Sequence, residues 1–282
     1  MSTAETLLKG FEGFLGTIPL DKYRQELLSV KTVEQDLPKD LNPLPDIYKQ
    51  YWTDSSRQFP DYESFFEQWW KDHLAPIDEF VKHYFWGCSY EFVRLGFKAR
   101  LYRTLISVLT QFHFSYAWRA FCTLPIETSA EMDMHGIDAL VRFRDIGVAL
   151  QMKKETYRPE ARKSGRFVQK QLHAKILIEL PYTIVSSKEW EQRKNRARDK
   201  RKKEEYALFH WLSTELQRWL PNGFVVFQDK YPRLVEQFIE DFLSGDYASQ
   251  DHIGWDELLK KIHTLSGDHL PVDDGSLHGS AQ

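Results

Sequence analysis

The sequence predicts an α/β (α+β) protein, in which a largely helical N-terminal region precedes a pair of adjacent β-strands and further helices. Residues 137–153 contain two consecutive stretches in which apolar and polar residues alternate, the period of half-buried strands. Residues 1–128 and 207–243 instead contain apolar residues three and four positions apart, the period of helices. Nine Trp and nineteen Phe among 282 residues provide enough apolar surface for a packed core.

The N-terminal region is expected to contain several helices. Residues 18–37 have apolar residues at helical spacing, and the proline-rich stretch 37–46 interrupts them. A second helix is expected over residues 62–73, with an aromatic stripe that faces the core. A long helix is expected to begin after Ser89, a suitable N-cap, and to continue to about Phe114. Apolar residues extend around most of this helix, so we expect it to be deeply buried.

A polar strip on this long helix includes Arg100 and Arg103. A buried guanidinium group needs a partner that accepts its hydrogen bonds. The sequence offers acidic residues such as Glu127 and Glu131, and a DNA phosphate is the alternative.

The central stretch, residues 131–155, contains the residues that suggest chemistry. One strand is expected from residue 137 to 143, and a second begins after the connection 144–147. The alternation of both strands predicts that Asp138, Gln151 and Lys153 share a face. That face would carry one carboxylate, one amide and one amine.

This set of groups suits metal-assisted hydrolysis of a phosphodiester. Mg²⁺ prefers hard oxygen ligands, so Asp138 is expected to bind it with the amide oxygen of Gln151 and the backbone carbonyl of Met152. Mn²⁺ is an alternative metal. Lys153 would orient or deprotonate the attacking water and offset the charge that develops on the phosphate.

The same residues resemble the signature of the PD-(D/E)xK nuclease superfamily: Gly136-Ile137-Asp138, twelve residues, and then Gln151-Met152-Lys153. The Gln in place of the usual acid is similar to the Mrr-type restriction branch. The resemblance covers about residues 89–187. It implies a restriction-endonuclease-like core, which is a mixed β-sheet flanked by helices. It also implies dependence on a divalent metal and hydrolysis of DNA, with catalytic positions at Asp138, Gln151 and Lys153.

Two features depart from the family pattern. Ile137 precedes Asp138 where the family has Pro, and the neutral Gln151 is a weaker metal ligand than a carboxylate. One further acid is therefore expected to supply the missing charge, and the candidates are Glu131, Asp133 and Glu155.

The resemblance favours a type II restriction endonuclease that cuts a short specific sequence in double-stranded DNA. A homodimer would match the two-fold symmetry of a palindromic site. A modification-dependent Mrr-like nuclease or a structure-specific repair nuclease is the second possibility. A DNA-binding protein with a catalytically silent core is the third, because Gln151 lowers the number of carboxylates.

Positive charge is concentrated in one part of the chain. Residues 151–203 contain seventeen Lys or Arg and six Asp or Glu, whereas the whole chain has a net charge of −3. Such a segment is typical of nucleic-acid contact. A basic helix is expected over residues 159–172 and an exposed charged helix or arm over residues 189–206. The candidate DNA-binding residues are Lys154, Arg158, Arg162, Arg166, Arg193, Arg196 and Lys200.

The remaining elements follow from turn and period signals. Because Pro181 disfavours a central strand, a strand is expected over residues 182–186. A helix is expected over 207–220, a strand over 224–227 and a helix over 231–243, before a frayed tail. We divide the chain into residues 1–88, a helical region for DNA recognition or dimerisation; 89–245, the nuclease core with a basic insertion at 188–206; and 246–282, a C-terminal helix and flexible tail.

The sequence has neither a membrane-spanning apolar run nor a secretory signal, which predicts a cytoplasmic protein without a membrane partner. Its two cysteines, Cys88 and Cys122, match neither a disulfide framework nor a zinc site, and we expect two buried, reduced thiols. No small-molecule cofactor is expected.

Overall fold

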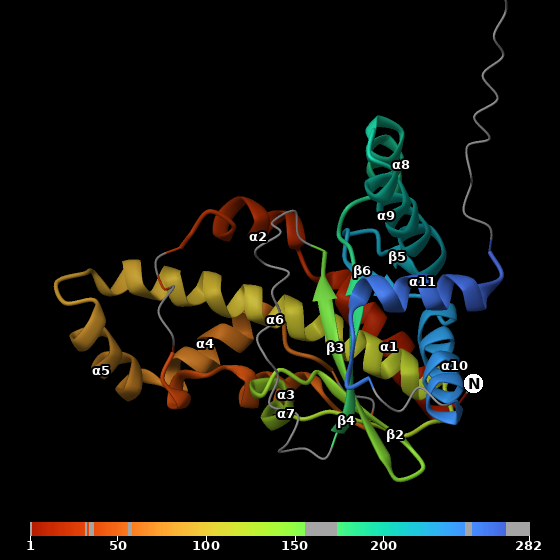
Figure 1. Cartoon of the computed structure of the whole chain (residues 1–282). Helices are drawn as coiled ribbons and strands as arrows, with labels where there is room; N and C mark the ends of the chain where they lie inside the picture. The colour runs from red at the N-terminus through yellow and green to blue at the C-terminus, as the bar shows by residue number, and fades with distance from the viewer. Residues whose placement is uncertain are drawn as a thin grey trace, which may run out of the picture.

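The computed structural model describes residues 2–31, 33, 37–55, 58–155, 174–245 and 250–268 (Figure 1). Its helices are α1 (Thr3–Thr17), α2 (Leu20–Leu27), α3 (Leu44–Tyr51), α4 (Tyr62–Asp72), α5 (Leu74–Tyr84), α6 (Tyr90–Phe121), α7 (Ala130–Met134), α8 (Ser187–Arg196), α9 (Lys200–Trp211), α10 (Lys230–Ser244) and α11 (Trp255–Ser266). Its strands are β1 (Ile126–Glu127), β2 (Ala139–Phe143), β3 (Ile146–Lys154), β4 (Ala174–Tyr182), β5 (Gln217–Trp219), β6 (Val225–Phe227) and β7 (His252–Ile253). The predicted fold class, a mixed sheet flanked by helices with a largely helical N-terminal region, is confirmed.

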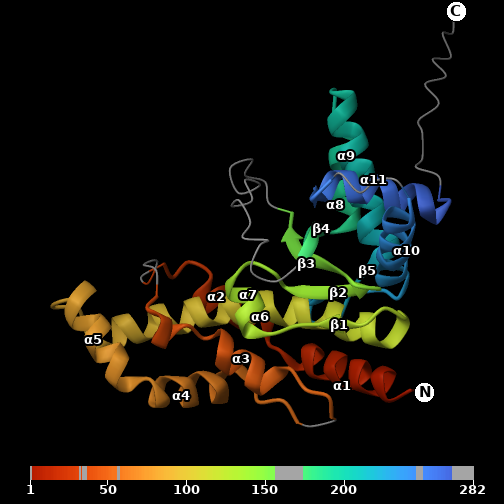
Figure 2. The same ribbon diagram turned by 60° about the horizontal axis from the view of Figure 1, so that its bottom comes forward.

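Helix α6 is the central element, and it lies between the N-terminal helices and the sheet (Figure 2). The side chain of Ser89 caps it by accepting a hydrogen bond from the N–H of Phe92 at 3.2 Å, as predicted. The helix continues seven residues beyond Phe114, to Phe121, because the next four residues are buried and no Gly or Pro interrupts the stretch.

Two hydrophobic cores meet along α6. The first packs α1 to α5 against one side of α6 along most of its length, with Phe97, Phe112 and Tyr116 among the buried residues. The second packs one face of the sheet against the C-terminal part of α6 and against α9, α10 and α11, with Phe114 and Trp118 among its members. Helix α6 therefore connects the N-terminal region rigidly to the sheet.

Both arginines of the polar strip on α6 bind backbone carbonyls, which the sequence did not predict as their partners. Arg100 donates to the carbonyl of Val33 at 3.2 Å, and Arg103 donates to the carbonyl of Val30 at 2.9 Å. These carbonyls lie beyond Leu27, where α2 ends ten residues earlier than the predicted helix. Carbonyls past a helix end have no intrahelical partner, so the guanidinium groups fill that role. Glu127, one of the predicted partners, instead pairs with Arg142 at 3.1 Å.

The sheet has the strand order β1-β2-β3-β4-β7. The pairs β1–β2 and β2–β3 are antiparallel, whereas β3–β4 and β4–β7 are parallel. The two predicted central strands are confirmed as the β2–β3 hairpin, which turns at Arg144 and Asp145; Arg144 has a φ of 54°. One face of the sheet packs on the second core, and the other carries a smaller cluster: Met132, Ile137, Leu140, Ala149, Ala174 and Leu177.

The prediction of a strand over residues 182–186 was wrong, because β4 ends at Tyr182 and contains Pro181. Pro181 pairs with Lys153 of β3, and its carbonyl accepts a hydrogen bond from the hydroxyl of Tyr231 at 2.8 Å. The backbone nitrogen of Pro181 faces the same side as this carbonyl, away from β3. On that side β7 pairs only with Leu177 and Ile178 of β4, so no ladder hydrogen bond is lost at the proline.

The charged stretch 189–206 lies in a hairpin of α8 and α9, which projects from the body in Figure 1. The predicted helix over 207–220 was too long, because a π-helical turn (Leu212–Leu216) leads into β5, which pairs with β6. Helix α10 agrees with its prediction. Beyond it, β7 joins the edge of the sheet and α11 packs on the second core.

Two smaller observations complete the fold. Cys88 is exposed and Cys122 is half-buried, so the expectation of two buried thiols was wrong; Cys88 lies in the turn after α5. In the part of the chain that the structure describes, no helix combines the length and the hydropathy needed to cross a lipid bilayer.

Candidate active site

Asp138 lies just before β2, and the backbone of β3 holds its carboxylate. The Oδ2 atom accepts a hydrogen bond from the N–H of Met152 at 2.5 Å, and the N–H of Asp138 donates to the carbonyl of Leu150 at 3.0 Å. The carboxylate thus extends the β2–β3 ladder by one residue, because it takes the place of a backbone acceptor. Only 6% of Asp138 is exposed, so its carboxylate is both buried and fixed in orientation.

Gln151 and Lys153 flank Met152 on β3. The side chains of a strand alternate between its two faces. Leu150 and Met152 pack on the second core, whereas Ala149 belongs to the smaller cluster on the opposite face. Gln151 and Lys153 therefore project from the face of Ala149, and both are half-buried.

The turn before β2 brings these two side chains close to Asp138. Gly136 has a φ of 79°, and a Cβ atom added to it would lie 3.5 Å from Nε2 of Gln151. The positive charge of Lys153 acts on the carboxylate of Asp138. The structure therefore brings Asp138, Gln151 and Lys153 together where β2 begins.

Asp133, on α7, forms a pair of carboxylates with Asp138. Burial raises the pKa of Asp138 to about 8, and the negative charge of Asp133 contributes to this rise, against the N–H of Met152 and the charge of Lys153. Burial also raises the pKa of Asp133 to about 6, although a hydrogen bond from Tyr48 acts in the opposite direction. Two carboxylates in such contact hold a proton near neutral pH unless a cation replaces it.

The two other candidate acids occupy different positions. Glu131 is an exposed residue of α7, and its carbonyl is 2.7 Å from Nδ1 of His135. Glu155 follows β3, and its N–H donates to the carbonyl of Tyr182 at 2.7 Å. Asp133 is thus the candidate acid whose charge acts directly on Asp138.

Sequence reasoning did not identify three polar residues near these acids. Tyr48 of α3 and Thr128, which precedes α7, contact Asp133 and Asp138. Glu179 is opposite Gln151 in the β3–β4 register and is only 5% exposed. An acidic residue flanked by apolar residues in a strand is a signal that the sequence contains, so Glu179 could have been found from it. The sequence around Tyr48 contains no such signal.

The donor atoms fit a small divalent cation. In the described residues no group of three or more His, Cys, Asp or Glu side chains is arranged to hold a metal, so a cation here would bind to two carboxylates and to neutral oxygens. The backbone carbonyl of Met152 points to the same side as its N–H, toward Asp138. Carboxylate, amide and carbonyl oxygens are the hard ligands that Mg²⁺ prefers.

The candidate DNA-binding residues lie in separate parts of the molecule. Lys154 is exposed and projects from the opposite face of β3 to Lys153. Lys200 is exposed at the start of α9. The predicted helix over 159–172, with Arg162 and Arg166, lies outside the described residues, and so does Arg158.

The tip of the α8–α9 hairpin contains a hollow of about 440 Å³. Positive side chains predominate in its wall, which also includes the N-cap of α9: Arg193, Arg196, Arg198, Asp199 and Lys202. Because the N-terminus of a helix also attracts anions, this hollow has the charge of an anion site.

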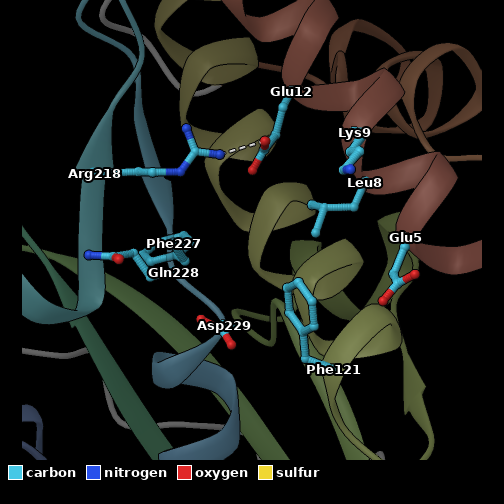
Figure 3. A pocket seen from close by; sticks show the side chains of 9 residues that line it. All are labelled: Glu5, Leu8, Lys9, Glu12, Phe121, Arg218, Phe227, Gln228 and Asp229. Atoms are coloured by element: carbon cyan, nitrogen blue, oxygen red, sulfur yellow. Dashed lines mark hydrogen bonds and ion pairs between the residues drawn. The ribbon is translucent and has the colours of Figure 1, made fainter. Parts of the chain in front are cut away.

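A larger hollow of about 600 Å³ lies between α1, the end of α6 and the β5–β6 hairpin (Figure 3). Glu12 in its wall forms an ion pair with Arg218, and its Oε1 atom lies 2.9 Å from Nε2 of the buried His113. These contacts join three elements of the fold. None of the candidate site residues lines this hollow, so we do not assign it to the active site.

Known proteins resemble the chain along most of its length. Residues 8–239 match the family model described as TaqI restriction endonuclease. The chain is 46% identical over 266 residues to the type II restriction enzyme TthHB8I of Thermus thermophilus, and 47% identical over 266 residues to the type II restriction enzyme TaqI of Thermus aquaticus. Each alignment covers 93% of this chain and 97% of the relative.

No solved structure is significantly similar to the chain. The family match extends from α1 to α10 and includes both acids and Lys153. The chain therefore belongs to the TaqI restriction endonuclease family.

Proposed function

We propose that the protein is a type II restriction endonuclease, which hydrolyses phosphodiester bonds at a short specific sequence in double-stranded DNA with Mg²⁺. The observation that carries this proposal is its similarity, over nearly the whole chain, to two proteins named type II restriction enzymes. The site supports it, because a buried carboxylate with a half-buried one and a lysine near it suits metal-assisted hydrolysis. This favours cleavage over the alternative of a silent DNA-binding core.

The proposed metal ligands are the carboxylates of Asp138 and Asp133, the amide oxygen of Gln151 and the carbonyl of Met152. When bound there, Mg²⁺ lowers the pKa of water and offsets negative charge on the phosphate. Lys153 is the cationic residue of the motif, and its positive charge lowers the pKa of Asp138. We assign it to orient the attacking water and to stabilise charge that develops on the phosphate oxygens.

We also propose that the core is of the PD-(D/E)xK type. An antiparallel hairpin carries Asp138 and the Gln151-Met152-Lys153 motif, and a parallel strand follows it, in support of this assignment. Asp133 supplies the second carboxylate, which the family pattern has at the position of Gln151.

A homodimer is the proposed active form. Two copies related by a two-fold axis would match a palindromic site, each copy cutting one strand. The division at residues 88 and 245, with recognition or dimerisation in the N-terminal helices, remains part of this proposal.

The α8–α9 hairpin is the proposed contact for the DNA backbone. Arg196 and Arg198 are exposed at its tip and line a hollow of positive charge with Lys202. Arg193 lies in the same wall, and Lys200 is on the exposed surface of α9 near the hollow. Such residues neutralise phosphates without regard to sequence.

Substitution of either acid should slow cleavage. Asp138→Asn and Asp133→Asn keep the size of the side chain but remove a charged metal ligand, and each should reduce the rate of Mg²⁺-dependent plasmid cleavage by about 100-fold or more. Glu131→Gln, an exposed change on the same helix as Asp133, should leave the rate unchanged. Cleavage by Asp138→Asn at the wild-type rate would contradict the proposed site.

Binding of Mg²⁺ at pH 7 should release a proton. The pKa of Asp138 in the metal-free protein is about 8, so its carboxyl is mostly protonated at pH 7, whereas a metal binds the carboxylate. The affinity for Mg²⁺ should therefore rise with pH, by up to about tenfold per unit, and level off above a pH of about 8. Because this folded-state pKa lies above the unfolded value, the same group stabilises the metal-free fold at low pH, and that contribution is lost as the pH rises through about 8.

Isothermal titration calorimetry in two buffers of different ionisation enthalpy measures this proton. Asp138→Asn, which cannot bind the proton, is the control. Equal proton release by the wild type and by Asp138→Asn would show that another group is titrating.

Removal of two charges from the hairpin tip should weaken DNA binding in general. The double substitution Arg196→Ala and Arg198→Ala should reduce affinity by about tenfold or more at about 0.15 M salt, and lower the slope of log affinity against log salt by about 2. Fluorescence anisotropy with duplexes of unrelated sequence measures both quantities. Lys9→Ala, on the exposed surface of α1, should change neither; a loss confined to one DNA sequence would instead indicate base contacts.

A further inference from the structure

The hydroxyl group of Tyr48 connects the N-terminal helices to the two acids of the site. Tyr48 lies on α3, and only 8% of it is exposed. Its ring packs edge-on against Phe112 of α6, with 4.7 Å between the ring centroids. The Oη atom lies 3.4 Å from Oδ2 of Asp133 and 3.0 Å from Oγ1 of Thr128.

The hydrogen atoms of these hydroxyl groups can be assigned by elimination. Thr128 donates its single proton to the backbone carbonyl of Asp138, at 2.6 Å. In the contact between Tyr48 and Thr128 the donor must therefore be Tyr48. The phenol proton is shared between Oγ1 of Thr128 at 3.0 Å and Oδ2 of Asp133 at 3.4 Å.

Tyr48 is suited to remain a donor. Burial raises the pKa of its phenol, and the negative charge of Asp133 raises it further, so the hydroxyl keeps its proton at physiological pH. A neutral donor beside a carboxylate fixes one of its oxygens and leaves the other free to turn toward a cation.

We propose that Tyr48 is a positioning residue, which holds the carboxylate of Asp133 toward Asp138 so that both acids present oxygens to the same divalent cation. Thr128 is the second member of this link, because it joins the Tyr48 hydroxyl to the backbone of Asp138. The proposal rests on the proposed function, since it assumes that the two acids bind the metal of a nuclease.

Tyr51 provides a matched control on the same helix. It is also buried, and its hydroxyl donates to the carbonyl of Pro60 at 3.1 Å. Tyr51→Phe therefore removes a buried hydroxyl and one hydrogen bond, as Tyr48→Phe does, but away from the acids. Any loss of Mn²⁺ affinity that results from disturbing α3 should be common to Tyr48→Phe and Tyr51→Phe.

The experiment compares the wild type, Tyr48→Phe and Tyr51→Phe as full chains. Electron paramagnetic resonance measures the binding of Mn²⁺ in the absence of DNA. Thermal unfolding measures the stability of each metal-free variant. Plasmid digestion gives the Mg²⁺ concentration at which cleavage is half-maximal. We expect Tyr48→Phe to weaken Mn²⁺ binding about tenfold and to raise the half-saturating Mg²⁺ concentration by a similar factor. Excess Mg²⁺ should restore most of the cleavage rate of Tyr48→Phe. Tyr51→Phe should match the wild type in Mn²⁺ affinity and in the half-saturating Mg²⁺ concentration.

Thr128 gives an independent test that does not require Tyr48→Phe to fold. Thr128→Ser keeps the hydroxyl and should bind Mn²⁺ like the wild type, whereas Thr128→Val removes it and should lose affinity. Unchanged Mn²⁺ affinity in Tyr48→Phe and in Thr128→Val would overturn the proposal, and so would an equal loss in Tyr51→Phe. Failure of the proposed function itself would be seen separately, as the absence of Mg²⁺-dependent DNA cleavage by the folded wild-type protein.

Discussion

The repulsion between the buried carboxylate of Asp138 and the half-buried carboxylate of Asp133 is the constraint on which the candidate site depends. Two negative charges in a weakly polar environment are unfavourable unless a proton or a cation lies with them. The backbone of β3 fixes Asp138 through the N–H of Met152, so this residue cannot turn away. The proposed binding of a divalent metal and the uptake of a proton in its absence therefore have the same physical origin.

The long helix α6 explains how a distant region of the chain takes part in this site. Phe112 belongs to the first core and packs on Tyr48, whereas Phe114 belongs to the second core, beneath the sheet. The two cores thus meet within one helical turn. The N-terminal helices are consequently more than an accessory to the sheet, because α3 reaches the acids through a side chain that α6 supports.

Local patterns were sufficient to predict the elements of the site. The alternation in residues 137–153 predicted the β2–β3 hairpin, and Ser89 predicted the start of α6. These features depend on neighbours in the sequence, for which periodicity and capping provide direct signals. The alternation of the two strands is therefore enough to place the three motif residues together.

Features that depend on long-range packing could not be predicted in this way. Tyr48 is 85 residues from Asp133, and nothing near it in the sequence indicates an acid partner. The carbonyl of Val30 can accept the hydrogen bond from Arg103 because α2 ends before it, at Leu27. The boundary of the strand around Pro181 was predicted wrongly. The short strand β7 leaves the side of β4 that the Pro181 nitrogen faces unpaired, and this is a property of the assembled sheet.

Digestion of unmodified plasmid and phage DNA is the most direct measurement. The wild-type protein should produce discrete fragments with Mg²⁺ and none with EDTA, and sequencing of the fragment ends should reveal one short common site. Lys153→Ala should bind the same DNA without cutting it, because the lysine stabilises charge on the phosphate rather than holding the duplex. Absence of Mg²⁺-dependent fragments from the folded wild-type protein, or wild-type cleavage by Lys153→Ala, would contradict the assignment of this site.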